Sequence, residues 1–150
     1  KPGEKYRVLE KIQLKGAYAY QATCIKELLS KYNVQFIGVD CTGPGIGVYE
    51  QVKTFFNRVT PITYSLETKT HLVLNAQDII ENNLIEWDAA QTEIPQSFMQ
   101  ITQEATATGQ ITYAAGRNDK TGHADAAFAI MHALHNEPLN RRKRKTTIAF

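Results

Sequence analysis

The sequence predicts an α/β domain in which helices flank a central, mixed but mostly parallel sheet. Three segments near the start of the chain carry this prediction. Residues 6–14 alternate apolar and polar side chains, which indicates a half-buried strand. Residues 17–32 repeat apolar side chains at steps of three and four, which is helical spacing. Residues 34–39 are almost continuously apolar and lead into Asp40, as in a strand that is covered on both faces.

The rest of the chain continues this alternation of helices and strands. In chain order, the expected elements are a helix over 47–56, a short strand over 62–64, a helix from about residue 67 to 80, an edge strand over 84–87, a helix over 95–102, an extended segment over 110–114, a polar loop over 116–122 and a helix over 124–134 that Pro138 would end. Right-handed crossovers would place the ends of the parallel strands, Asp40 included, along one rim where ligands usually bind.

Length and composition describe an ordinary globular domain. A chain of 150 residues can bury one sizeable core, and its 43% hydrophobic and 21% charged residues exclude a disordered or fibrous class. No apolar run approaches the roughly 18 residues of a membrane span, so we expect no membrane partner. Two cysteines are too few for a disulfide scaffold, which favours a reducing, cytosolic setting.

The charge is distributed unevenly along the chain. Residues 141–145 supply five of the 17 Lys and Arg residues, which leaves 12 basic against 15 acidic residues elsewhere. We therefore expect one domain over residues 1–139 and a flexible basic tail over 140–150. Such a tail could bind DNA nonspecifically or only aid solubility. The chain starts at Lys1 without a Met, and we expect it to be a fragment of a longer protein.

The first candidate site is the segment 39–47, in which Asp40 precedes a turn built on Gly43, Gly45 and Gly47. In one interpretation, backbone N–H groups of the turn bind a nucleotide or S-adenosylmethionine. In a second, the turn is a tight connection and Asp40 is a metal ligand at the sheet rim. In a third, Asp40 is structural. The spacing G-x-G-x-G differs from the dinucleotide motif G-x-G-x-x-G, which favours the metal ligand.

The second candidate is Asp125, which lies in the first turn of the last expected helix. An Asp at this place also complements the helix dipole, so taken alone it is explained by a structural role. The pair with Asp40 changes this interpretation, because two carboxylates at one rim of an α/β sheet can hold Mg²⁺ or Mn²⁺. Two such ions can stabilise the attacking and leaving oxygens of phosphodiester hydrolysis. A third acid should then come from elsewhere.

The remaining candidates carry weaker signals. The histidines at 71, 132 and 135 fall in expected helices and form no H-E-x-x-H motif, which favours core or surface roles. No serine lies in a G-x-S-x-G elbow, so a serine hydrolase is not expected. Lys69, Arg117 and Lys120 could contact phosphates beside the acidic rim, although solvated surface charge also explains each of them.

Five runs of residues carry a resemblance to a known family. They lie at 32–43, 64–70, 97–101, 122–125 and 131–139, and the last one ends in the distinctive sequence Asn-Glu-Pro-Leu. Over residues 6–139 the chain resembles the large terminase subunit of P2-like tailed bacteriophages. The resemblance implies the nuclease domain of a genome-packaging motor, with an RNase H-like fold.

The resemblance also assigns roles to individual residues. Family members hold metal with a carboxylate on the first strand, one on the strand after the first helix, and one at the start of a late helix. The second corresponds to Asp40 and the third to Asp125, while His123, Thr42 and Gly43 would support these acids. The first strand with its carboxylate, and an ATPase half, would precede residue 1.

Taken together, the resemblance implies two Mg²⁺ or Mn²⁺ ions and double-stranded DNA as the substrate. It also implies the small terminase subunit and the portal protein as partners, in the cytoplasm of the bacterial host. The resulting hypothesis is an endonuclease that cuts concatemeric phage DNA by a two-metal mechanism. Two other interpretations stay open: an S-adenosylmethionine-dependent methyltransferase that uses the turn over residues 43–47, and a non-catalytic module that docks to DNA or to the portal.

Overall fold

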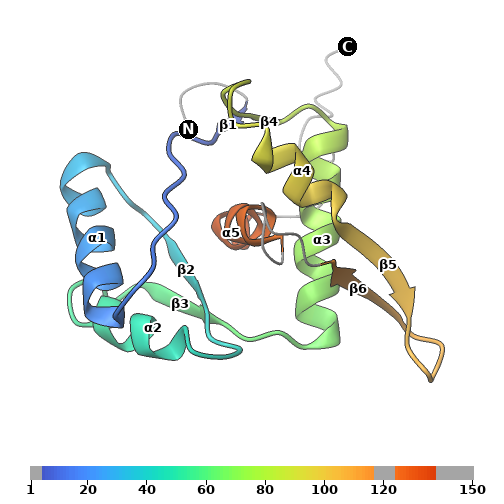
Figure 1. Ribbon diagram of the computed structural model, residues 1–150, viewed down its shortest axis with the longest axis horizontal. Coiled ribbons are helices and arrows are strands. Elements are labelled where there is room, and N and C mark those ends of the chain that lie inside the picture. Colours follow the sequence, from blue (N-terminus) through green and yellow to red (C-terminus); the bar gives the residue numbers. More distant parts are fainter. Residues whose placement is uncertain (1–4, 117–123, 138–150) are drawn as a thin grey trace, which may run out of the picture.

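The computed structural model describes residues 5–116 and 124–137 of the chain. Helices and strands alternate through most of this part, as the sequence predicts (Figure 1). In chain order the elements are β1 (Tyr6–Arg7), α1 (Tyr18–Lys31), β2 (Ile37–Asp40), α2 (Ile46–Lys53), β3 (Val59–Ile62), α3 (Leu66–Glu81), β4 (Ile85–Glu86), α4 (Glu93–Met99), β5 (Ile101–Ala105), β6 (Ile111–Ala115) and α5 (Asp125–Ala133).

The strands pair two by two. β2 and β3 are parallel, with Ile37 opposite Val59 and Asp40 opposite Ile62. β1 and β4 are also parallel, whereas β5 and β6 form an antiparallel hairpin. The mixed, mostly parallel pairing is therefore as predicted, but within the described residues it appears as separate two-stranded sheets and not as one continuous central sheet.

Helix α5 lies at the centre of the molecule. Figure 1 shows it nearly end-on, with α1, α2, β2 and β3 on one side and α3 and α4 on the other. Gly38 makes this packing possible, because a Cβ there would lie 3.0 Å from the His132 carbonyl oxygen and 2.9 Å from Cδ1 of Ile62. A glycine in a strand commonly marks such a close backbone approach. The backbone of α5 therefore rests directly on β2.

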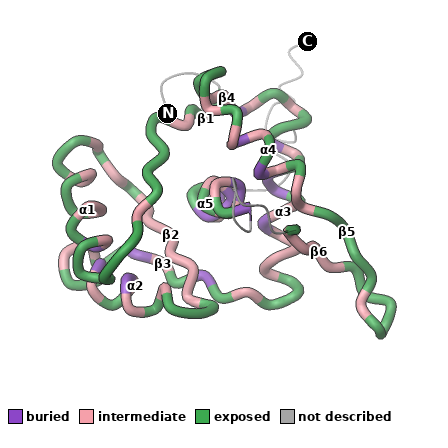
Figure 2. Tube along the Cα trace, viewed as in Figure 1, coloured by how far each residue is buried: buried purple, intermediate pink, exposed green. Residues whose placement is uncertain are grey.

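The largest group of buried apolar side chains joins β3, α3 and α5. Its members are Ile62, Leu72, Ala76, Ala124, Ala127 and Met131. A second group lies between α1, α2 and β3, and a third joins α3, β4 and the end of α5. Figure 2 shows buried residues on the facing sides of α3, α4 and α5, while the β5–β6 hairpin is largely exposed. The core thus surrounds the helix that begins at Asp125.

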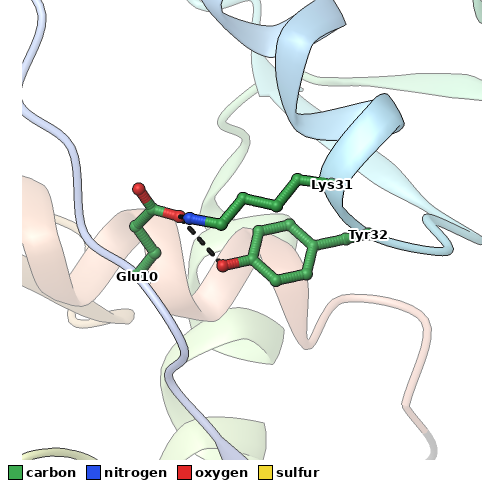
Figure 3. A network of polar contacts seen from close by, with 3 residues as sticks. All are labelled: Glu10, Lys31 and Tyr32. Atoms are coloured by element: carbon green, nitrogen blue, oxygen red, sulfur yellow. Dashed lines mark hydrogen bonds and ion pairs between the residues drawn. The ribbon is translucent and has the colours of Figure 1, made fainter.

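The strand expected over residues 6–14 is much shorter in the structure. Only Tyr6 and Arg7 pair with β4, and Leu9 and Ile12 are 65% and 47% exposed. The Val8 N–H still donates to the Glu86 carbonyl oxygen at 2.9 Å, but residues 9–17 pair with no strand among those described, so the alternating pattern does not extend the strand. Polar contacts hold this segment instead. Figure 3 shows one of them, in which Glu10 accepts hydrogen bonds from Lys31 at 2.7 Å and from the Tyr32 hydroxyl at 2.9 Å.

Two other boundaries differ from the prediction. The strand expected at 62–64 runs from Val59 to Ile62, and Pro61 is accommodated because β3 lies at the edge of its sheet. The helix expected over 95–102 ends at Met99. Ile101 and Thr102 instead pair with Ala115 and Ala114 in the hairpin, so tertiary pairing overrides the local helical pattern.

Some sequence predictions lie outside the described residues. These are the polar loop after residue 116 with Arg117 and Lys120, the predicted supporting residue His123, and the basic tail over 140–150. Within the described part, no helix is long and apolar enough to cross a membrane.

Candidate active site

Asp40 lies at the carboxyl end of β2, where the strand leaves the sheet. Its pairing with Ile62 is continued by a hydrogen bond from the Cys41 N–H to the Ile62 carbonyl oxygen at 2.8 Å. The side chain is half-buried, and its Oδ1 accepts a hydrogen bond from the Thr42 N–H at 2.8 Å. This turn holds the carboxylate in a defined orientation.

The glycine turn after Asp40 is explained by close packing. A Cβ on Gly45 would lie 1.8 Å from the Asp40 carbonyl oxygen, and one on Gly47 would lie 2.4 Å from the Tyr18 ring. Both distances are far below van der Waals contact, so these positions admit only glycine without a rearrangement. By contrast, nothing lies within 4 Å of a Cβ on Gly43. The packing favours the interpretation of the turn as a tight connection that presents Asp40.

Asp125 is the first residue of α5, as the sequence predicts. The residue before it, Ala124, is fully buried and has a left-handed backbone with φ 62° and ψ 35°. Such a conformation costs an alanine about 1–2 kcal/mol and persists where the surroundings impose it. Ser97 of α4 provides one restraint, because its buried Oγ accepts a hydrogen bond from the Ala127 N–H at 3.0 Å. A side chain distant in sequence thus caps the first turn of α5.

One face of α5 carries Asp125 together with two ring side chains. Asp125, Phe128 and His132 are spaced three and four residues apart and therefore lie along one side of the helix. Tyr64, just beyond β3, packs against this side. Its ring centroid is 5.4 Å from that of Phe128 and 5.7 Å from that of His132, and its hydroxyl lies 2.8 Å from Nε2 of His132.

Tyr64 also contacts the turn that follows Asp40. Its N–H donates a hydrogen bond to Oγ1 of Thr42 at 3.0 Å, next to Asp40. Burial raises the pKa of its phenol, and the negative charges of Asp40 and Asp125 raise this pKa further. Both carboxylates contribute to this shift, one as the last residue of β2 and the other as the first residue of α5.

Comparison with known proteins identifies the family. The model of the terminase RNaseH-like domain family matches residues 1–137. The chain belongs to this family. The terminase ATPase subunit of Escherichia phage P2 is 46% identical over 139 residues, and the probable terminase ATPase subunit of Haemophilus phage HP1 (strain HP1c1) is 45% identical over 147. These matches cover 91% and 96% of this chain but 24% of each relative, so this terminase domain spans about a quarter of their length.

Solved structures agree with the family assignment. The large terminase nuclease of thermophilic phage G20c matches with a TM-score of 0.69 at 21% identity, over 83% of this chain and 64% of that one. A structure of the same nuclease with bound magnesium matches with a TM-score of 0.64 at 19% identity, over 81% of this chain and 62% of that one. At these identities the likeness shows the fold, and the predicted RNase H-like class is confirmed.

A lysine lies beside the aromatic group of the terminase domain. The Lys69 ammonium is 6.0 Å from the Tyr64 ring centroid and 5.8 Å from that of Phe128, within the range of a cation–π interaction. Lys69 is thus the one predicted phosphate contact that falls within the described residues. It places a positive charge next to the phenol on which Asp40 and Asp125 act.

The donor set of the terminase domain fits a hard divalent cation but is incomplete. Carboxylate oxygens are the ligands that Mg²⁺ and Mn²⁺ prefer. However, residues 5–116 and 124–137 contain no group of three His, Cys, Asp or Glu side chains that could hold a metal ion. Glu93 lines a pocket of about 350 Å³ together with Asp125, but it forms an ion pair with Lys11 at 2.7 Å. This ion pair lowers the pKa of Glu93 and engages its charge.

Sequence reasoning missed two contributors in the terminase domain. His132 fits the predicted core role, because it is only 7% exposed, but the structure adds its contact with the Tyr64 hydroxyl. Ser97 lies in no catalytic motif, and the structure shows that it caps α5. No local signal could reveal either contact, because the partners are 68 and 30 residues apart.

Proposed function

We propose that this domain is a metal-dependent DNA endonuclease of a phage packaging terminase, which hydrolyses phosphodiester bonds of concatemeric viral DNA. The observation that carries the proposal is the match to the terminase RNaseH-like family, in which Asp40 ends β2 and Asp125 begins α5, the helix that packs on β2. Two carboxylates that met at one site of such a fold would form a negative centre suited to divalent cations. The proposed partners are double-stranded DNA, the small terminase subunit and the portal, in the host cytoplasm.

Asp40 and Asp125 would hold Mg²⁺ or Mn²⁺. When bound, two such ions would stabilise the attacking and leaving oxygens. The G20c nuclease structure with bound magnesium supports this choice of cation. On this chain, the Thr42 N–H fixes one oxygen of Asp40, so that the other can face a ligand. Asp125 is exposed, and among the described residues its carboxylate forms no hydrogen bond or ion pair, so it is available to bind.

We propose that a third carboxylate comes from a strand of the longer polypeptide. An open groove of about 790 Å³ lies between the segment after β1, α1 and α5, and its walls include Leu9, Ile12, Leu28 and Ile130. Leu9 and Ile12 are exposed at this groove, where a further strand would bury them. The match covers 24% of the phage P2 relative, and in a polypeptide of that length another segment would supply such a strand.

Contact with DNA would be made mainly to phosphates. Lys69, held over two aromatic rings, is the candidate within the described residues, and Arg117 and Lys120 remain candidates outside them. Contacts of this kind give affinity that falls with salt and carries little sequence information. Bound cations would also reduce the repulsion between the two carboxylates and an approaching phosphate.

The test replaces each acid by its uncharged amide in the complete polypeptide. Asp40→Asn and Asp125→Asn should each abolish nicking of plasmid DNA in Mg²⁺ or Mn²⁺, while the melting temperature stays close to that of the parent protein. Asp88→Asn is the matched control, because Oδ1 of Asp88 accepts the N–H two residues later at 2.8 Å, as in Asp40. The control should cut DNA normally. Full activity in either of the two site variants would refute the proposal.

A further inference from the structure

Lys15 and Asp125 line the same pocket, which lies between residues 11–15, the start of α4 and the start of α5. Its volume is about 350 Å³, and its charged lining residues are Lys11, Lys15, Glu93 and Asp125. We propose that Lys15 binds a phosphate of the DNA backbone in this pocket, beside the acid that begins α5. This role of Lys15 rests on the proposed function, because it requires DNA as the ligand.

The pocket has room for one backbone phosphate with its sugar. Small-molecule sites measure about 300–1,000 Å³, and this pocket lies at the lower end of that range. The apolar side chains that line it, and that a sugar could contact, are Ile12, Leu14, Ala126 and Ala129. A lysine beside such a space contacts the phosphate charge without reading a base. The pocket therefore suits a DNA contact that is independent of sequence.

The charges of the pocket leave Lys15 available to an anion. Lys11 and Glu93 form an ion pair at 2.7 Å, so these two lining residues neutralise each other. Lys15 is exposed and forms no ion pair with any residue that the structure describes. Its ammonium is a compact charge with three donors, which suits the oxygens of a phosphate.

The backbone around Lys15 is restrained on both sides. On the N-terminal side, Lys11 is tied to α4 by its ion pair with Glu93. On the C-terminal side, Gly16 has a φ of 116°, which favours glycine, and its carbonyl oxygen accepts a hydrogen bond from Nε2 of Gln21 at 2.9 Å. The turn after Lys15 is thereby held against α1. A backbone ordered in this way loses little conformational entropy when DNA binds.

The same segment leads to the turn that presents Asp40. Tyr18, the first residue of α1, packs on the start of α2, where a Cβ on Gly47 would lie 2.4 Å from Cδ2 of the ring. Lys15 is three residues before Tyr18, a distance of at most about 11 Å along the chain. Lys15 therefore lines the pocket of Asp125 and also lies close to the glycine turn after Asp40.

The pocket stays accessible if a further strand fills the neighbouring groove of about 790 Å³. Lys11, Ile12 and Leu14 line both the pocket and the groove. Gln13 and Lys15 line the pocket but do not belong to the lining of the groove. A strand in the groove would thus leave the polar side of this segment open to DNA.

The first test measures how DNA binding depends on salt. The affinity of the complete polypeptide for a labelled duplex is measured by fluorescence anisotropy in EDTA, so that no metal-dependent cleavage occurs. In Lys15→Gln, the slope of log affinity against log salt should become shallower by about 1, as expected for the loss of one phosphate contact. Lys15→Arg keeps the charge and should keep the slope of the parent. An unchanged slope in Lys15→Gln would overturn the inference.

Lys26→Gln is the matched control for the change in net charge. Lys26 is an exposed lysine of α1, and within the described part of the chain it also forms no ion pair. Its ammonium lies 5.8 Å from the Phe55 ring centroid, and it does not line the pocket. The salt slope of Lys26→Gln should equal that of the parent. A change as large as in Lys15→Gln would mean that net charge alone sets the affinity, and the role of Lys15 would fail.

The second test asks whether the phosphate enters the pocket of Asp125. Without a divalent cation, the Asp125 carboxylate repels a phosphate bound in the same pocket. Asp125→Asn should therefore raise the affinity for DNA in EDTA, and this gain should vanish when it is combined with Lys15→Gln. Asp88→Asn should leave the affinity unchanged. No gain in Asp125→Asn, or an equal gain with and without Lys15, would place the phosphate elsewhere and refute the assignment.

The outcomes distinguish the role of Lys15 from the function on which it rests, because both tests measure binding and not cleavage. If Asp40→Asn and Asp125→Asn lose nicking and Lys15→Gln keeps the salt slope of the parent, the nuclease stands and the role of Lys15 fails. If the two Asn variants cut DNA as the parent does and Lys15→Gln has the shallower slope, the acids lose their proposed role and the phosphate contact stands. If the parent neither binds nor cuts DNA, both fail.

Discussion

Asp40 ends β2 and Asp125 begins α5, and the two acids are held in different ways. Asp40 is fixed through its own side chain, which accepts the Thr42 N–H, and through a turn so tight that Gly45 touches the Asp40 backbone. Asp125 has no such contact within the described residues and depends on the start of α5. There, the left-handed Ala124 and the Ser97 cap set the direction of the helix.

The comparison shows that one acid is oriented locally and the other by long-range packing. The side-chain hydrogen bond of Asp40 and the close approach at Gly45 both lie within residues 40–47, and pairing with β3 supports them. Those on Asp125 come from α4 and from the core around Ala124, which is 0% exposed. Substitutions near Asp40 should therefore act through steric contact, whereas substitutions around Asp125 should act through the hydrogen bonds and packing of α5.

The largest expected effect comes from Gly45→Ala. The added Cβ would lie 1.8 Å from the Asp40 carbonyl oxygen, so the turn must move. We expect a loss of about 3 kcal/mol in the free energy of unfolding, measured with urea, together with weaker cleavage. Gly43→Ala is the control, because its Cβ would meet nothing within 4 Å, and its stability should change by less than about 0.5 kcal/mol. Equal stability of the two variants would contradict the tight turn.

A smaller effect is expected from Ser97→Ala, which removes the cap of α5. The Ala127 N–H then loses its partner in a buried place, and such a loss costs about 1–2 kcal/mol. Urea unfolding measures this loss, and amide hydrogen exchange should show faster opening at the first turn of α5. Ser30→Ala provides the comparison, because Ser30 is exposed on α1 and should change stability by less than about 0.5 kcal/mol. The role of the cap would be disproved if both variants were equally stable.

The parts of the fold that sequence could predict are those with local causes. Helical spacing located α1, α2, α3 and α5, and the apolar run located β2 with Asp40 at its end. The failures depend on distant partners. The alternation over 6–14 contains no information about whether a neighbouring strand is present, and β5 begins at Ile101 because β6 pairs with it.

The site divides in the same way. Asp40 and Asp125 could be predicted because each is a carboxylate at the boundary of a recognisable element. Tyr64 could be placed near the end of a strand, but its contact with His132 spans 68 positions. That contact forms when α5 packs across β2 and β3, so only the folded structure reveals it.

The histidines offer a way to perturb α5. The first 70 residues, which include Asp40 and its turn, contain no histidine. His132 and His135 belong to α5 and to the turn after it, and burial lowers the pKa of both. The charge of Asp40 opposes this shift at His132, while His71 adds to it at His135. The neutral forms of these side chains are thus favoured in the folded protein.

Acidification should therefore weaken the packing of α5, an effect that we expect to be smaller than that of either substitution. Below the usual histidine pKa of about 6.5, the unfolded chain binds more protons than the folded one, so stability falls as the pH is lowered. Urea unfolding at pH 7.5, 6.5 and 5.5 should show this decrease, and His135→Gln should make it shallower. Amide signals of α5 should broaden at pH 5.5 before those of α1 and α2. If α1 and α2 loosened first, Asp40 would not be the locally held acid, because its surroundings would depend on α5 as those of Asp125 do.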